Sequence, residues 1–168
     1  MKTLCTLALV MLSLLTTSAV RAVDKVDLTK FSGKWYSLYS IPTMFDKDSR
    51  ETTTYYTLSK EGYYNVVTEA KKGDENGLKI YKSKLYPVAG TNNTELKAQF
   101  MWPFKVDYSI IELADDYSYV VVGHPEKKFL FIMSRKPYMD PKLHEEIVAR
   151  CKAKGYDVAK LVSQKHHA

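Results

Sequence analysis

The fold can be predicted from the stretch DLTKFSGKWY, residues 27–36, in which Gly33 and Trp35 open the first of eight β-favouring runs. Each run is rich in Tyr, Val, Thr, Ile and Phe, and turn clusters of Gly, Asp, Asn, Pro and Lys separate it from the next. The predicted strands are 34–41, 52–59, 63–70, 78–87, 95–100, 106–113, 117–122 and 129–134.

The connections between these runs are short. Residues 60–62, 114–116 and 123–128 are hairpin-like, so consecutive strands are expected to be antiparallel neighbours. With no helix between them, closing the sheet removes both exposed edges and leaves an interior that can hold one small ligand. The sequence therefore predicts an all-β fold, an eight-stranded antiparallel up-and-down barrel.

The last part of the chain has the period of a helix. Asp140 can cap it, Pro141 suits its first position, and Leu143, Ile147 and Cys151 recur every four residues. Gly155 is typical of a residue just beyond a helix end, so the helix is expected to end near residue 154. We expect it to pack on the outside of the barrel and to bury Cys151 as a small hydrophobic residue.

The N-terminus has the order of a secretory signal. Lys2 precedes an apolar run over residues 4–15, and small and polar residues follow up to Ala22. The run is shorter than the roughly 20 residues of a membrane-spanning helix. We expect residues 1–22 to be a signal peptide and residues 23–168 to form one domain. Cys151 is then its only thiol, which excludes an internal disulfide.

Composition and motifs argue against two classes of protein. The formal net charge of the 168 residues is +6, but Lys and Arg are spread along the chain, so no nucleic-acid partner is expected. His124 is isolated, His144 has no metal-spaced partner, and residues 166–167 lie in a tail expected to be mobile. No nucleophile–base pair, zinc motif or phosphate-binding glycine loop is visible. We therefore expect no catalytic residue, metal or cofactor, and no enzyme.

Three motifs resemble those of the lipocalins. Residues 27–36 resemble the family's opening motif, a helical turn followed by Gly-x-Trp-Tyr on the first strand. Residues 115–117, Asp-Asp-Tyr, are similar to the second motif, between the sixth and seventh strands, and residues 134–135, Ser-Arg, to the third. The chain most resembles the group formed by bacterial lipocalins, apolipoprotein D and the plant temperature-induced lipocalins.

The resemblance implies a site and a ligand class. It places Trp35 at the closed end of the barrel, with Arg135 against its ring as a cation–π pair. Relatives in this group bind fatty acids, lysophospholipids and sterol- or haem-like lipids. Two departures concern the compartment, because the bacterial members commonly carry a lipid-anchored cysteine that this chain lacks, and apolipoprotein D has disulfides.

The candidate ligand-binding residues follow from strand alternation with Trp35 facing inward. Tyr and Phe walls suit an acyl chain or a flat ring, and phenolic hydroxyls can bind a polar head group. At the mouth, residues 42–51 carry Met44 and Phe45, and residues 101–105 carry an apolar run that includes Trp102. The candidate residues are Trp35, Tyr39, Thr54, Tyr56, Tyr64, Val66, Thr68, Phe100, Trp102, Tyr108, Phe131 and Met133.

The predicted function is a secreted or periplasmic carrier, a monomer or homodimer, that holds a small hydrophobic ligand. We expect this ligand to be a lipid such as a fatty acid or a lysophospholipid. Two alternatives stay open. One is a membrane-associated stress or lipid-repair protein that docks through its apolar mouth. The other is a lipocalin-fold enzyme acting on a lipophilic substrate.

Overall fold

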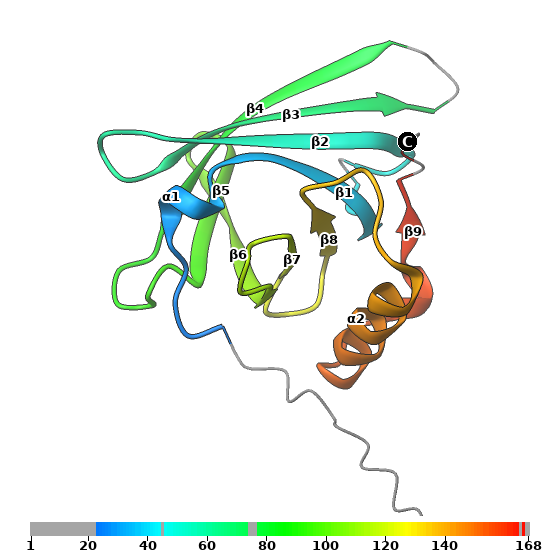
Figure 1. The fold of residues 1–168 in the computed structure, drawn as a ribbon. Helices are drawn as coiled ribbons and strands as arrows, with labels where there is room; N and C mark the ends of the chain where they lie inside the picture. Colours follow the sequence, from blue (N-terminus) through cyan, green and yellow to red (C-terminus); the bar gives the residue numbers. More distant parts are fainter. Residues whose placement is uncertain (1–22, 45, 74–76, 165, 167–168) are drawn as a thin grey trace, which may run out of the picture.

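A computed structural model describes residues 23–44, 46–73, 77–164 and 166. Eight antiparallel strands form a closed barrel, and a helix lies on its outside (Figure 1). The predicted signal peptide lies outside the described residues. The elements are α1 (Leu28–Phe31), β1 (Gly33–Ile41), β2 (Ser49–Leu58), β3 (Tyr64–Lys72), β4 (Leu78–Pro87), β5 (Glu95–Met101), β6 (Phe104–Leu113), β7 (Tyr119–Gly123), β8 (Leu130–Ser134), α2 (Pro141–Ala153), η1 (Val158–Lys160) and β9 (Val162–Ser163).

Each strand from β2 to β7 pairs with the next along the chain, as an up-and-down barrel requires. β1 closes the barrel because it pairs with β2 through its first half and with β8 through its second half. The predicted eight-stranded barrel is confirmed. Among the described residues, no helix is long and apolar enough to cross a membrane.

The short helix α1 covers the closed end. Asp27 caps it, since one carboxylate oxygen accepts hydrogen bonds from the backbone N–H groups of Thr29 and Lys30. Phe31, at the end of α1, is fully buried against the rings of Trp35 and Tyr56. The rings of Phe31, Trp35 and Tyr56 therefore form an aromatic layer across the closed end of the barrel.

The helix α2 packs on the outer face of the barrel, as predicted (Figure 1). Asp140 caps it by accepting a hydrogen bond from the backbone of Leu143, and Ile147 and Cys151 are fully buried. These residues meet the outward side chains of Val121 on β7 and of Leu130 and Ile132 on β8. A second hydrophobic cluster therefore lies between the helix and the barrel wall.

A β-bulge in β1 overturns one predicted orientation. Ser37 pairs with Met133 and Tyr39 pairs with Ile132, so Leu38 is an extra residue in the strand. Tyr39 consequently packs in the outer cluster, with its ring stacked on His144 of α2 at 3.8 Å between centroids. The prediction that Tyr39 faces the lumen is wrong because strict alternation was carried through this bulge.

The C-terminal segment is part of the barrel wall. β9 pairs with β1, and the backbone of Gln164 links the two strands beside it: its N–H donates to Leu38, and its carbonyl accepts from Glu51. The Gln164 side chain, 2% exposed, bonds the hydroxyls of Ser40 and Thr52. We call this bridge between β1 and β2 the seam. Residue 166, expected in a mobile tail, places its ring nitrogen 2.9 Å from the carbonyl oxygen of Ser37.

Candidate functional site

Trp35 and Arg135 lie against one another at the closed end, as the resemblance to lipocalins implied. The central carbon of the guanidinium lies 3.7 Å from the ring centroid of the fully buried Trp35. Arg135 also donates to the backbone carbonyls of Lys34 (2.9 Å) and Lys30 (2.7 Å), and the indole N–H of Trp35 donates to that of Phe31. One side chain thus holds α1 and β1 to the end of β8.

The Asp-Asp-Tyr turn joins the same assembly. The Tyr117 hydroxyl accepts a hydrogen bond from the backbone of Asp27, and the Tyr117 carbonyl accepts one from Arg135. Ser118 donates to the carboxylate of Asp116, and these hydrogen bonds lower the pKa of Asp116. All three sequence motifs therefore meet at the closed end, where their hydrogen bonds hold the segments of the barrel base together.

The lumen floor is built from three tyrosines on different strands. The hydroxyls of Tyr56 and Tyr108 lie 2.7 Å apart, and the Tyr64 hydroxyl donates to the carbonyl of Leu28. Burial raises the pKa of Tyr56 to about 12 and also raises those of Tyr64 and Tyr108. At neutral pH these phenols are protonated, so they can donate or accept hydrogen bonds but do not act as bases.

Above this floor several inward side chains carry hydroxyl groups. Thr54 and Thr68 face one another across β2 and β3, with their hydroxyls 3.3 Å apart. Ser37 pairs with Met133 and Ser40 with Phe131, which packs against the buried lumen cluster. This part of the barrel wall therefore combines a few hydroxyl groups with apolar side chains, as sites for small apolar ligands do.

The rim of the mouth carries exposed apolar side chains. Trp102 is 82% exposed and Phe104 71%, at the turn between β5 and β6. Phe100, predicted to face the lumen, is 64% exposed. The β5–β6 register shifts between Ala98 and Met101, and the β4–β5 ladder ends at the Lys84–Gln99 pair, so no ladder partner covers Phe100 on that side. That prediction is wrong for this reason.

A hollow of about 380 Å³ lies along β3 and β4 beside Trp102. We call it the side cleft. It lies between β4 and the β5–β6 turn, and its lining residues are Asn65, Val66, Val67, Lys82, Ser83, Lys84, Gln99 and Trp102.

The other predicted site residues come together inside the barrel. Their burial fits the predicted inward orientation, while ligand contact stays a prediction for all of them. The residues packed in or against the lumen cluster are Trp35, Tyr56, Tyr64, Val66, Tyr108, Phe131 and Met133.

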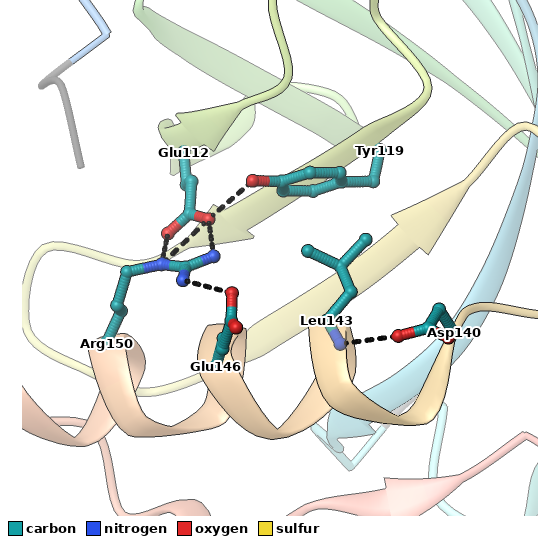
Figure 2. Close-up of polar contacts among 6 residues, drawn as sticks. All are labelled: Glu112, Tyr119, Asp140, Leu143, Glu146 and Arg150. Carbon is teal, nitrogen blue, oxygen red and sulfur yellow. Dashed lines mark hydrogen bonds and ion pairs between the residues drawn. The ribbon is translucent and has the colours of Figure 1, made fainter. Parts of the chain in front are cut away.

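Sequence reasoning missed a polar cluster under α2, which Figure 2 shows. Arg150 donates through Nε to both carboxylate oxygens of Glu112 at 3.1 Å, and the Tyr119 hydroxyl donates to the same carboxylate at 2.9 Å. Glu112 is only 3% exposed because a bulge in β6 turns it under the helix. An acidic residue inside a β-favouring run and an arginine in the last helical turn were the only available signals.

Two titratable groups outside the lumen, Cys151 and His144, are shielded by the packing of α2 on the barrel. Burial raises the pKa of the Cys151 thiol to about 11, which makes it a poor nucleophile at neutral pH. Burial lowers the pKa of His144, which is stacked on Tyr39. Within the described ranges, no group of three or more His, Cys, Asp or Glu residues could hold a metal ion. The expectation that the chain is not an enzyme stays a prediction.

Comparison with known proteins places this geometry among relatives. The model of the lipocalin-like domain family matches residues 26–166. The outer membrane lipoprotein Blc of Escherichia coli K12 is 27% identical over 143 residues, covering 85% of this chain and 81% of the relative. Temperature-induced lipocalin-1 of Arabidopsis thaliana is 26% identical over 150 residues, covering 84% and 80%.

Solved structures agree on the fold. Insecticyanin from the tobacco hornworm Manduca sexta superimposes with a TM-score of 0.69 at 18% identity, covering 88% of this chain and 85% of that one. This likeness extends to the whole barrel and concerns the fold alone.

Proposed function

Because the chain belongs to the lipocalin family, whose members generally bind small hydrophobic ligands, we propose that this protein carries a single-chain lipid, a fatty acid or lysophospholipid, in its barrel. The observation that carries the proposal is the contrast within the lumen. An aromatic floor of Trp35, Tyr56 and Tyr108 lies beneath a wall that combines the hydroxyls of Thr54 and Thr68 with apolar side chains. An acyl chain can lie along the apolar part of this wall and end on the floor.

The polar group of such a ligand also has hydrogen-bond partners on the lumen wall. The paired hydroxyls of Thr54 and Thr68 lie on the lumen wall, where they can bond an ester or carboxyl group. The predicted signal peptide supports export from the cytoplasm, so we propose a secreted or periplasmic protein. The similar protein Blc of Escherichia coli is an outer membrane lipoprotein, which supports a location outside the cytoplasm.

Tryptophan fluorescence tests the proposal cleanly, because one tryptophan lies in the floor and the other on the rim. Trp35 is fully buried, whereas Trp102 is 82% exposed. In a Trp102→Phe variant, titration with a fatty acid and with a lysophospholipid should quench or shift the emission of Trp35 in a saturable manner. Native mass spectrometry should show one unchanged lipid per barrel.

A matched pair of substitutions keeps the test specific. Thr68→Phe fills the lumen, whereas Thr57→Phe makes the same change on the exposed outer face of β2. The lumen variant should lose about tenfold or more in lipid affinity, about 1.4 kcal/mol, and the outer variant should not. Equal affinities for both variants, or no saturable signal with either lipid, would overturn the lumen as the site.

A further inference from the structure

One nitrogen beneath the helix α2 has no hydrogen-bond partner. His144 lies at the end of the first turn of α2, and its ring is stacked on that of Tyr39 at 3.8 Å between centroids and 21° between planes. Its Nε2 atom is buried, and within the described ranges it is the one buried side-chain nitrogen or oxygen that makes no hydrogen bond. A buried N–H group without an acceptor is costly, so a proton on Nε2 is disfavoured in the docked helix.

The other two histidines that the structure describes have hydrogen-bond partners. Nδ1 of His124 accepts a hydrogen bond from the backbone N–H of Glu126, and a ring nitrogen of His166 lies 2.9 Å from the carbonyl oxygen of Ser37. Protonated His166 can keep its contact, because both ring nitrogens of an imidazolium are donors. The same rule makes His144 different, since its imidazolium would carry an N–H on Nε2 with no acceptor.

The charged groups on the elements that pack around α2 are paired with one another. The carboxylate of Glu112, on β6, is bound by Arg150, and Lys160 of η1 pairs with Asp157 just before that segment. The strands β7 and β8 meet the helix mainly with apolar side chains. These charges are therefore committed to partners other than the ring of His144.

Two further features act against a positive charge on this ring. His144 lies near the N-terminus of α2, where the helix dipole disfavours cations. Burial lowers the pKa of His144 below its ordinary value of 6.5, although the carboxylate of Glu145 acts in the opposite direction. From β1 the ring faces Tyr39, which would favour a cation through its π face. The sign of the acid effect therefore decides between the two influences.

We propose that His144 is an acid-sensitive switch for the docking of α2: in mild acid its ring takes up a proton, and the helix loosens from the barrel wall. The detached helix leaves His144 in water, where it binds a proton below about pH 6.5, whereas the docked helix resists that proton. Docking is therefore strongest above this pH and weakens as the pH falls below it. Loosening would expose the apolar cluster of Ile147, Val121 and Ile132, and it does not depend on lipid carriage.

The thiol of Cys151 reports the state of the helix, because it is fully buried beneath α2. All proteins in the experiment carry Cys5→Ser, so that Cys151 is the only thiol. Its reaction with dithiodipyridine, a thiol reagent that stays active in acid, is measured at about pH 7.5 and about pH 5 at equal ionic strength. The rate for the urea-unfolded protein at the same pH, divided by the native rate, gives the protection of the thiol by the fold.

Protection of Cys151 should fall by about tenfold between the two pH values in the protein that retains His144. A tenfold change corresponds to about 1.4 kcal/mol, within the cost of an unpaired buried N–H group. His144→Phe keeps a ring on Tyr39 but cannot take up a proton, and its protection should not fall. The matched control His144→Phe/Ala149→His carries a histidine on the exposed face of α2, and it should behave like His144→Phe.

Three results would overturn the switch. An equal fall in His144→Phe, or an equal fall in the double variant only, would assign the acid effect to other groups or to any histidine on the helix. Unchanged or greater protection in acid with His144 present would show that Tyr39 stabilises the imidazolium. An NMR titration needs no variant of this ring: its signals should titrate below pH 6.5, and the backbone signals of Leu143 and Ile147 should shift with the same midpoint. Helix signals that do not follow the ring would also overturn the proposal.

Discussion

Arg150 on α2 forms an ion pair with Glu112 on β6 and donates hydrogen bonds to it through two nitrogens. The terminal nitrogen Nη2 lies 2.6 Å from one carboxylate oxygen (Figure 2). The side chain of Glu112 is 4% exposed and that of Arg150 20%. The pair therefore fixes the position of the helix on the barrel wall under partial exclusion of water, where breaking one partner leaves a buried charge.

Arg150→Ala should consequently lower the free energy of unfolding by about 3 kcal/mol, because the buried Glu112 carboxylate keeps the Tyr119 hydroxyl as a donor but loses its charged partner. Urea denaturation measures the loss. Glu146→Gln is the control, since its carboxylate is half exposed and lies 3.7 Å from Arg150, and it should change stability by less than about 0.5 kcal/mol. Equal losses would contradict the assignment.

Arg135→Lys should weaken the closed end. A lysine keeps the charge over Trp35 but cannot place several N–H donors on the carbonyls of Lys34, Lys30 and Phe31 at once. We expect a loss of about 2 kcal/mol in urea denaturation. The exposed neighbour Lys136→Ala should be nearly neutral, and a neutral Arg135→Lys would show that the charge alone suffices.

Gly123→Ala should destabilise the junction between β7 and the segment after α2. A Cβ at this position would lie 2.1 Å from the hydroxyl of Tyr156, which is buried and donates to the carbonyl of His124. The clash should cost about 1–3 kcal/mol. Gly77→Ala, where a Cβ meets nothing within 4 Å, is the matched control. In a double-mutant cycle, Tyr156→Ala should remove most of the cost of the added methyl group.

Stability should fall in alkaline solution through Cys151. Its pKa is raised from 9.0 to about 11 by burial, so folding favours the protonated thiol. This contribution is complete below pH 9 and is lost as the pH rises from 9 to about 11. Unfolding curves of the wild type and of Cys151→Val should therefore converge or cross over this interval, and parallel curves would contradict the shift. At pH 8 a thiol reagent should modify Cys151 only on unfolding.

The sequence predicted what local patterns determine. Gly33 and Trp35 located the first strand, the four-residue recurrence of Ile147 and Cys151 gave the buried face of α2, and the motifs implied the contact between Trp35 and Arg135. These features depend on period, capping and short motifs, which neighbouring residues encode.

The missed features depend on tertiary contacts. The bulge at Leu38 follows the point where β1 changes its pairing partner from β2 to β8. It turns the side chain of Tyr39 to the outside of the barrel. Phe100 is exposed because β4 and β5 separate beyond Lys84. The partner of Glu112 lies on an element 38 positions away. No local pattern contains this information, because each outcome is set by which distant strand or helix covers the position.

The seam also determines when the barrel can be completed. Gln164 bonds Ser40 across 124 positions of the chain. The first strand synthesised, β1, pairs with β2 through its first half and finds its other partners in β8 and β9, the last two. On the ribosome β1 must therefore wait with one edge unsatisfied until almost the whole polypeptide has emerged. Closure of the wall therefore comes late, and a chain halted before β8 would present an open sheet edge to the cell's quality control.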